Sequence, residues 1–271
     1  MTQSPSQAMQ HIATRFVEAR KRAEPLTDYP GDVPDDLEAA YRIQDLAIDL
    51  WPEPIVGWKV ARMPPAVEAE LGSDRLAGPV FNHCIARAES GEAPEMPIIV
   101  GGFAAVEAEF IVVIDRDAPA DKLRWSRDEA LAMIGDLRIG LEIAGSPLAT
   151  INQLGALAVV SFCGNNTGLV VGPAITDWRS RSLESLRSTT TVGGEEVGSG
   201  GAFNLTDGYV RSVQFLLELS ARRKRPLRAG DVIATGQTNG VHALNVGQIS
   251  VTDFGDDGQV GVRPVAATAI G

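Results

Sequence analysis

The segment Val106–Ile114, with the sequence VEAEFIVVI, places two acidic residues inside an otherwise apolar run. Its β-branched and aromatic residues favour a strand, in which alternate side chains point to the same face. Glu107 and Glu109 therefore share one face with Ile111 and Val113, while the other face is entirely apolar. A strand that is apolar on both faces is typical of a sheet interior. The chain must therefore fold so that two carboxylates about 7 Å apart become buried.

Buried carboxylates repel each other and lose hydration, so a cation has to neutralise them. Glu142, within the run IGLEIAG at residues 139–145, is a third carboxylate in an apolar strand. Three carboxylates without a neighbouring His or Cys favour Mg²⁺, or Mn²⁺, over zinc. The alternative is a solvent-facing edge strand, because E-x-E is a common pattern. We predict a metal site formed by Glu107, Glu109 and Glu142.

The rest of the chain changes character at Pro52. Apolar residues recur at helical spacing over residues 7–23, and again from Pro34, which suits a first helical position, to Trp51. After Pro52, short apolar runs alternate with Gly and Pro, a pattern typical of strands. We predict strands at Ile55–Val60, Val106–Ile114, Ile139–Ile143, Leu169–Val171, Val232–Thr235, Ile249–Phe254 and Val260–Val262. The expected fold is α+β, with a helical segment, residues 1–52, packed on a β-rich domain, residues 53–271, as one structural unit.

Two more helices are expected among these strands. Residues 126–129 form a capping box, and apolar residues continue at helical spacing to Leu137. Thr206 or Asp207 would cap the second helix. Two short strands joined by Gly193-Gly194 predict a hairpin with a two-residue turn. The glycine-rich residues 198–201 lack the Lys-Ser/Thr of a phosphate loop, so we interpret them as a flexible connection.

Composition limits the partners and the compartment. Asp and Glu outnumber Lys and Arg by 35 to 24, for a net charge of −11, which argues against nucleic-acid or anionic-membrane binding. No apolar run reaches the length of about 18 residues that a membrane span needs, and the N-terminus lacks signal-peptide features. The only two cysteines, Cys84 and Cys163, are far apart in the sequence and do not have the spacing of a metal site. This argues against a disulfide scaffold and against a thiolate zinc site. We expect a cytoplasmic protein.

Five short motifs together resemble the fumarylacetoacetate hydrolase superfamily, and most closely its 2-keto-4-pentenoate hydratase and oxalocrotonate decarboxylase branch. The motifs are YRIQ at residues 41–44, GWKV at 57–60, VEAEF at 106–110, LEIA at 141–144 and AGDVIATG at 229–236. Their order and spacing agree with the family from residue 35 or so to the C-terminus. Each motif is weak alone, so the signal lies in their combination.

This resemblance implies a mixed β-roll that holds one Mg²⁺ through the three glutamates. It also implies a homo-oligomer and a small anionic 2-oxo acid as substrate, bound through its carboxylate and its 2-oxo or enol oxygen. The expected activity is that of a Mg²⁺-dependent lyase that uses a metal-stabilised enolate, with hydration of 2-hydroxypenta-2,4-dienoate as the first assignment. The alternatives are a decarboxylase or keto–enol tautomerase on the same platform, or a non-catalytic domain that binds 2-oxo acids.

The resemblance also assigns roles to single residues. Lys59 matches the family lysine that holds the substrate carboxylate or the enolate oxygen; its alternative is a surface lysine on a strand edge. Thr235, with Gly236, matches the position that contacts the substrate carboxylate; its alternative is a plain turn. Gln44 would reach the site by analogy, or it is an ordinary buried glutamine.

The acid–base residues depart from the family pattern. No carboxylate aligns with the family's general base, and Asp74 would replace it only if its loop shifts. Asn165 keeps the amide of the family's Asp-Asn-x-Ser segment, but the acid is lost. Arg62 is a new cation near Lys59 that would serve a second substrate carboxylate. His242 is a further catalytic candidate, and His83 a weaker one whose alternative is a structural role.

Overall fold

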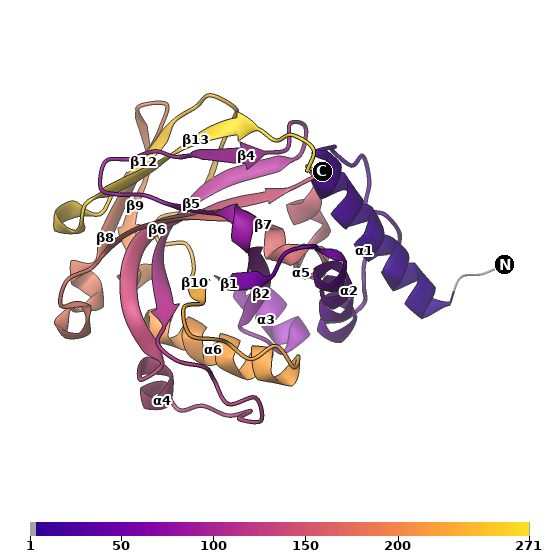
Figure 1. Ribbon diagram of the computed structural model, residues 1–271, viewed down its shortest axis with the longest axis horizontal. Helices are drawn as coiled ribbons and strands as arrows, with labels where there is room; N and C mark the ends of the chain where they lie inside the picture. Colours follow the sequence, from indigo (N-terminus) through magenta and orange to yellow (C-terminus); the bar gives the residue numbers. More distant parts are fainter. Residues whose placement is uncertain (1–3, 271) are drawn as a thin grey trace.

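The computed structural model describes residues 4–270 and contains two sheets, of which the larger is mixed and curls around itself (Figure 1). Its strand order is β2-β1-β10-β5-β6-β7-β3, and β11 also pairs with β5. The β1–β10 and β3–β7 pairs are parallel and the other pairs are antiparallel. The strands are β1 (Ile55–Arg62), β2 (Arg75–Phe81), β3 (Ile85–Arg87), β5 (Phe103–Ile114), β6 (Ile134–Ser146), β7 (Asn166–Ala174), β10 (Val232–Ala234) and β11 (Val241–Ala243).

The second sheet has five strands in the order β4-β13-β12-β8-β9. They are β4 (Glu95–Ile98), β8 (Arg187–Val192), β9 (Glu195–Gly201), β12 (Ser250–Asp253) and β13 (Gln259–Ala266). The sheets pack together, and Phe254 after β12 meets Phe110 of β5 edge to face with ring centroids 5.6 Å apart. The apolar residues of both sheets and of the N-terminal helices belong to one hydrophobic cluster.

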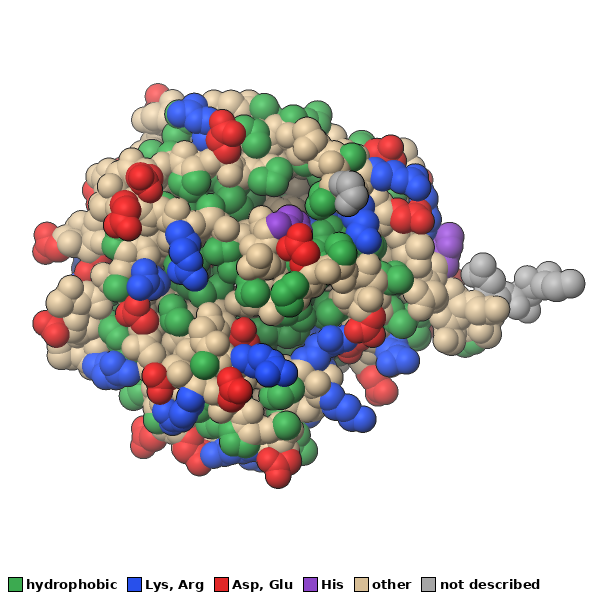
Figure 2. Space-filling model, viewed as in Figure 1, with side chains coloured by type: hydrophobic (Ala, Val, Ile, Leu, Met, Phe, Trp, Pro, Cys, Tyr) green, Lys and Arg blue, Asp and Glu red, His purple; other side chains and the backbone are tan. Residues whose placement is uncertain are grey.

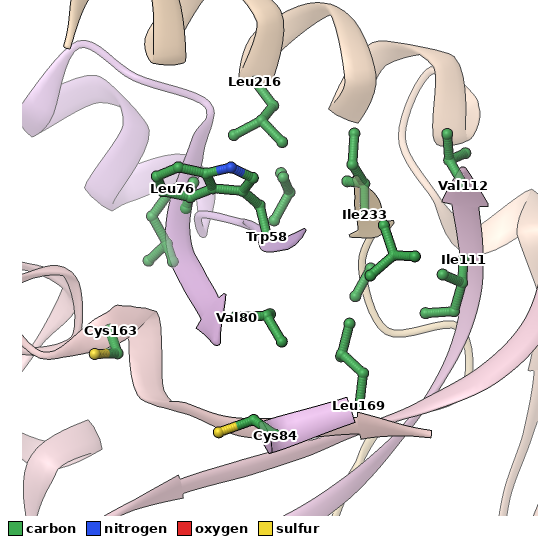
Figure 3. Close-up of a cluster of buried hydrophobic side chains, with 14 of the residues drawn as sticks. Trp58, Leu76, Val80, Cys84, Ile111, Val112, Cys163, Leu169, Leu216 and Ile233 are labelled. Carbon is green, nitrogen blue, oxygen red and sulfur yellow. The ribbon is translucent and has the colours of Figure 1, made fainter. Parts of the chain in front are cut away.

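Helices cover the larger sheet on two sides (Figure 1). Phe16 of α1 stacks on Phe162, which follows α5, at 4.3 Å, and α2 packs beside it. Leu216 of α6 lies above the indole of Trp58 in the core (Figure 3). The helices are α1 (Pro5–Arg22), α2 (Leu37–Leu50), α3 (Pro65–Leu71), α4 (Arg127–Leu131), α5 (Ala156–Ser161) and α6 (Gly208–Arg222). None of the described helices is long and apolar enough to cross a membrane.

All seven predicted strands lie within observed strands or overlap them, and the predicted hairpin is present as β8 and β9. Gly193 and Gly194 both have positive φ, 61° and 89°, which the tight turn requires. The predicted change from helical to strand-forming sequence at Pro52 falls between α2 and β1. The α+β class and the mixed, curled sheet of the expected β-roll are confirmed.

Three local predictions are wrong. The helix predicted to run to Leu137 ends at Leu131, and Ile134 and Leu137 belong to β6, because pairing with the long strand β5 outweighs a periodicity that suits either structure. The N-terminal helix predicted to begin at Pro34 is α2, and it starts at Leu37. Asp36 is its N-cap and accepts a hydrogen bond from the Ala39 amide.

The third concerns the glycine-rich residues 198–201, which form the end of β9 and are not a flexible connection. A Cβ at Gly198 or Gly200 would overlap the carbonyl of Asn239 or Thr238, respectively. Glycine is therefore required there because another backbone passes close by, and not because the segment moves.

A second close approach positions one wall of the cavity described below. Gly78 of β2 pairs with Lys59 of β1, and the short 3₁₀ turn η3 (Cys163–Asn165) lies directly against it. A Cβ at Gly78 would overlap the carbonyl group of Cys163. The absence of a side chain at Gly78 therefore lets the turn that carries Asn165 approach Lys59.

Gly78→Ala should lower the free energy of unfolding by about 3 kcal/mol, since backbone atoms must move apart to relieve the overlap. Gly72→Ala is the control, because it adds a methyl group at φ 67° where no atom lies within 4 Å. That change should cost only the backbone strain, about 1 kcal/mol. Urea unfolding followed by tryptophan fluorescence measures both, and equal losses would contradict the packing argument.

Candidate metal centre

The three predicted glutamates meet on two neighbouring strands. Antiparallel pairing of β5 with β6 sets Glu107 directly opposite Glu142, and Glu109 opposite Gly140. One carboxylate oxygen from each of the three lies within 4.8 Å of the others. Glu109 and Glu142 are fully buried and Glu107 is 7% exposed. The strand alternation that the sequence predicted therefore produces a compact, buried carboxylate cluster.

Three donors orient this cluster. Lys59 Nζ lies 3.3 Å from Glu142 Oε1, and Asn166 Nδ2 donates to the same oxygen at 2.9 Å. The Gly236 amide donates to Glu109 Oε2 at 2.6 Å. The remaining oxygens of these two residues, Glu109 Oε1 and Glu142 Oε2, are buried and accept no hydrogen bond. Buried acceptors in that state are costly unless a further ligand engages them.

The electrostatics of the cluster also call for a cation. Burial and then the Glu142 charge raise the pKa of Glu107 to about 7, and the same two causes raise the pKa of Glu109 well above its ordinary value. Burial alone would lower the pKa of Lys59, but the glutamates, Glu142 first, raise it, so this lysine is protonated. The raised pKa values show that the three carboxylates cannot all be ionised without a cation, and in the fully ionised state they and the Lys59 ammonium carry a net charge of −2. A divalent ion with hard oxygen ligands fits both the charge and the donor set, which supports Mg²⁺ or Mn²⁺.

A cavity of about 670 Å³ opens beside the cluster. Lys59 and Glu107 form part of its wall, and apolar side chains such as Met63, Leu76 and Phe103 form another part. Its volume is in the range of small-molecule sites. Polar and charged residues also line it, namely Asn152, Asn165, Asn204, Thr206, Gln237, Arg62 and Arg75.

The structure brings most of the predicted substrate-binding residues to this cavity. Lys59, Arg62, Asn165, Thr235 and Gly236 all line it. Thr235 Oγ1 donates to the Phe110 carbonyl at 2.7 Å, so its hydroxyl is already engaged. Asn165 Nδ2 donates to Asn152 at 3.2 Å, whereas its Oδ1 is buried without a partner. Arg62 pairs with Glu68 at 2.7 Å.

Four other candidates do not line the cavity, namely Asp74, His242, Gln44 and His83. Asp74 forms ion pairs with Arg62, Arg75 and Arg211 and borders a separate hollow. These ion pairs hold its carboxylate away from the cavity. His242 is on β11, where alternation turns its neighbour Val241 to the cavity, and its Nε2 contacts the Asn239 carbonyl at 3.1 Å.

Gln44 has the contacts of an ordinary buried glutamine. Its amide donates to the carbonyls of Ala77, at 3.0 Å, and Val160, at 2.6 Å, and it does not line the cavity. His83 also lies away from the cavity, beside Cys84.

Two residues of the site were not singled out from the sequence. Asn166 bonds Glu142, although the prediction named its neighbour Asn165. The sequence shows two adjacent asparagines, Asn165 and Asn166, before the predicted strand Leu169–Val171. It does not show which side-chain amide faces Glu142, because the pairing register of β6 with β7 determines this. Arg75 is buried and binds Ser212, the Thr206 carbonyl and Asp74. A charged residue at the head of the apolar strand β2 was its only signal.

The family model described as "Fumarylacetoacetate (FAA) hydrolase C-terminal" matches residues 69–264, which is most of the chain. The protein therefore belongs to the fumarylacetoacetate hydrolase family. Two curated relatives are named 2-keto-4-pentenoate hydratase. The one from Burkholderia vietnamiensis is 27% identical over 240 residues, and the one from Paraburkholderia phymatum is 25% identical over 237. Each alignment covers 86% of this chain and 88% of the relative.

Solved structures agree with the fold. The 4-oxalocrotonate decarboxylase from Pseudomonas putida G7, complexed with magnesium and adipate, has a TM-score of 0.79 at 20% identity, covering 97% of this chain and 99% of that one. The fumarylpyruvate hydrolase from Pseudomonas aeruginosa, in complex with Mn²⁺ and pyruvate, has a TM-score of 0.58 at 16% identity, covering 79% and 91%. The shared architecture is thus present over the whole chain in the first case.

The double substitution Glu107→Gln and Glu142→Gln should abolish Mg²⁺ binding, since it removes two anionic ligands and leaves their size unchanged. Calorimetric titration with Mg²⁺ measures this directly. As a control, Glu195→Gln and Glu196→Gln alter two exposed residues of β9 and should bind the ion as the unchanged protein does. Mg²⁺ at a hundredfold excess over its Kd should stabilise the control by about 2.7 kcal/mol and the site variant not at all. Normal binding by the folded site variant would refute the ligand assignment.

Proposed function

We propose that this protein is a Mg²⁺-dependent lyase acting on a small anionic 2-oxo acid, with hydration of 2-hydroxypenta-2,4-dienoate as the first assignment. The observation that carries the proposal is the buried cluster of Glu107, Glu109 and Glu142, with Lys59, at the wall of the 670 Å³ cavity. The hydratase names of the curated relatives support the reaction. The metal preference is also consistent with the magnesium and Mn²⁺ complexes of the solved structures.

The protein groups have separable tasks at this cavity. Mg²⁺ bound by the three glutamates would supply a Lewis acid for the 2-oxo group. Lys59 presents a protonated ammonium group at the wall, where it would bind the substrate carboxylate and hold a proton near the reacting atoms. Asn165 and the apolar wall around Met63 would orient the carbon chain.

A second reaction, decarboxylation of a 2-oxo dicarboxylate, is favoured by a specific observation. The described residues lining the cavity include no His or Asp. Apart from the two arginines, only Lys59 and Glu107 among these described residues have ionisable side chains. Hydration needs a base for water, whereas C–C cleavage or keto–enol tautomerisation requires fewer acid–base groups. Arg62 and Arg75 also line the cavity, and a second substrate carboxylate would compete there with Glu68 and Asp74, which already pair with them. The adipate bound by the solved decarboxylase is also a dicarboxylate.

Assays with 2-hydroxypenta-2,4-dienoate and with oxaloacetate, each with and without Mg²⁺, distinguish these reactions. Mg²⁺-dependent loss of the dienoate absorbance supports hydration, and CO₂ release supports decarboxylation. Ligand binding without turnover of either compound would instead favour a non-catalytic binding domain.

Lys59→Met should lower kcat/KM by about 10²-fold or more while leaving Mg²⁺ binding in place, since it removes the cation from the cavity and no metal ligand. Lys122→Met is the matched control, because Lys122 is a surface lysine paired with Glu129. Steady-state kinetics at saturating Mg²⁺ test the difference. An active Lys59→Met variant would exclude a role for this lysine in turnover.

We also propose a cytoplasmic homo-oligomer. Both cysteines are buried and neither forms a disulfide, which is compatible with a reducing compartment. The expected oligomer follows the family resemblance, and light scattering of the purified protein measures it.

A further inference from the structure

Away from the metal centre, Arg20 of α1 is a buried cation that lacks a carboxylate partner. It is 8% exposed, and none of the described Asp or Glu residues forms an ion pair with it. Its guanidinium donates to the carbonyls of Asn166, at 3.1 Å, and Thr167, at 3.2 Å, and to Cys84 Sγ at 3.2 Å. A buried charge requires an opposite charge or extensive hydrogen bonding. Among these partners, only the Cys84 thiol can become an anion.

A second cationic donor meets the same sulfur. His83 Nε2 lies 3.2 Å from Cys84 Sγ, and His83 Nδ1 lies 2.8 Å from Glu53 Oε2. Glu53 also accepts a hydrogen bond from the His83 amide at 2.9 Å, and Trp51 stacks on the imidazole with centroids 5.6 Å apart. The ring is therefore fixed by three neighbours. A thiol, an imidazole and an orienting carboxylate in this order form the arrangement that activates nucleophilic cysteines.

The surroundings distinguish the two cysteines. Burial would raise the pKa of Cys84, but the Arg20 charge and the His83 hydrogen bond lower it below its ordinary value. The hydrogen bond to Cys84 is the main cause that raises the pKa of His83. Burial raises the pKa of Cys163 and outweighs the opposing effect of Arg20, which also acts on this thiol. In Figure 3 both sulfurs lie at the edge of the apolar core and point away from its centre.

Access to this cluster is narrow and comes from outside the substrate cavity. Cys84, His83 and Glu53 do not line the 670 Å³ cavity. Glu53 borders a different hollow of about 360 Å³, and the side chains of His83 and Glu53 are each 31% exposed. Cys84 itself is 5% exposed. Only a small reagent can therefore reach the sulfur, while its proton can leave through the imidazole.

We propose that Cys84 is a thiolate, the counter-ion of Arg20, and a reactive site for small hydroperoxides that is separate from the metal centre. The sulfur attacks one peroxide oxygen, the S–O bond forms and the O–O bond breaks. Sulfur loses two electrons, which reduce the departing oxygen. The attacked oxygen keeps its hydrogen as the S–OH group, and protonated His83 gives its proton to the departing oxygen, so hydrogen peroxide yields one sulfenic acid, one water and neutral His83.

Ultraviolet titration of the thiolate tests the charge state. The wild-type protein should show one thiolate signal well below the ordinary thiol pKa of about 8.5. Cys84→Ser should remove this signal and Cys163→Ser should keep it. His83→Gln should move it to higher pH, with about tenfold less thiolate for each unit of pKa. An unchanged signal in Cys84→Ser would show that Cys84 is a neutral thiol and would overturn the proposal.

Treatment with hydrogen peroxide, trapping with a cyclic dione and peptide mass spectrometry test the reactivity. At mildly acidic pH, Cys84 should be oxidised at least about tenfold faster than Cys163, since the thiolate is the nucleophile. Arg20→Lys should retain part of this difference and Arg20→Met should remove it. Lys21→Met is the control, because Lys21 lies over the same Trp51 ring but does not contact the sulfur.

Arg20→Met removes a buried side chain, and this variant could fail to fold for that reason alone. His83→Gln then tests the oxidation rate of Cys84 independently. Oxidation of Cys84 no faster than Cys163 in the folded wild-type protein would also overturn the proposal, even if a thiolate were present.

Discussion

Antiparallel pairing between β5 and β6 is the constraint on which the rest of the molecule depends. These are the two longest strands, and their register places Glu107 opposite Glu142 among the buried apolar residues of the same strands. The sheet can cover this pair only if cations and donors converge on it. Lys59 arrives from β1, the Gly236 amide follows β10, and Asn166 begins β7. Folding energy and function are linked here, because the hydrophobic faces that stabilise the strands are also what removes water from the carboxylates.

The chemistry of the site was largely predictable from strand alternation. A period of two places Glu107 and Glu109 on one face without any knowledge of the fold, and the apolar neighbours of Glu142 show that it too is buried. The register between β5 and β6, by contrast, depends on pairing over the whole length of both strands. The sequence therefore identified the three carboxylates, while the structure shows that their oxygens converge.

The unpredicted features depend on contacts between distant segments. Helical spacing misassigned Ile134 and Leu137, because a few apolar residues satisfy both periods until a partner strand is present. The glycines of β9 and Gly78 are fixed by backbones that pass beside them, which no local pattern reports. Asp74 was predicted as a replacement for the family's general base from its place in the corresponding segment, but its ion pairs with Arg62, Arg75 and Arg211 determine where it lies. Arg20 likewise acquires its importance only from the carbonyls and the sulfur that surround it.

Arg20 links the N-terminal helix α1 to the region that the family model matches. The family model begins at residue 69, beyond both the lysine of the cavity and the N-terminal helices. Arg20 nevertheless donates to the backbone carbonyl of Asn166, whose side chain donates to Glu142, so the N-terminal helix α1 supports a predicted metal ligand through two contacts. The region matched by the family model therefore receives one of its contacts from outside its own bounds. A fragment that begins at residue 69 would lack Arg20, and with it this support for the side chain that orients Glu142.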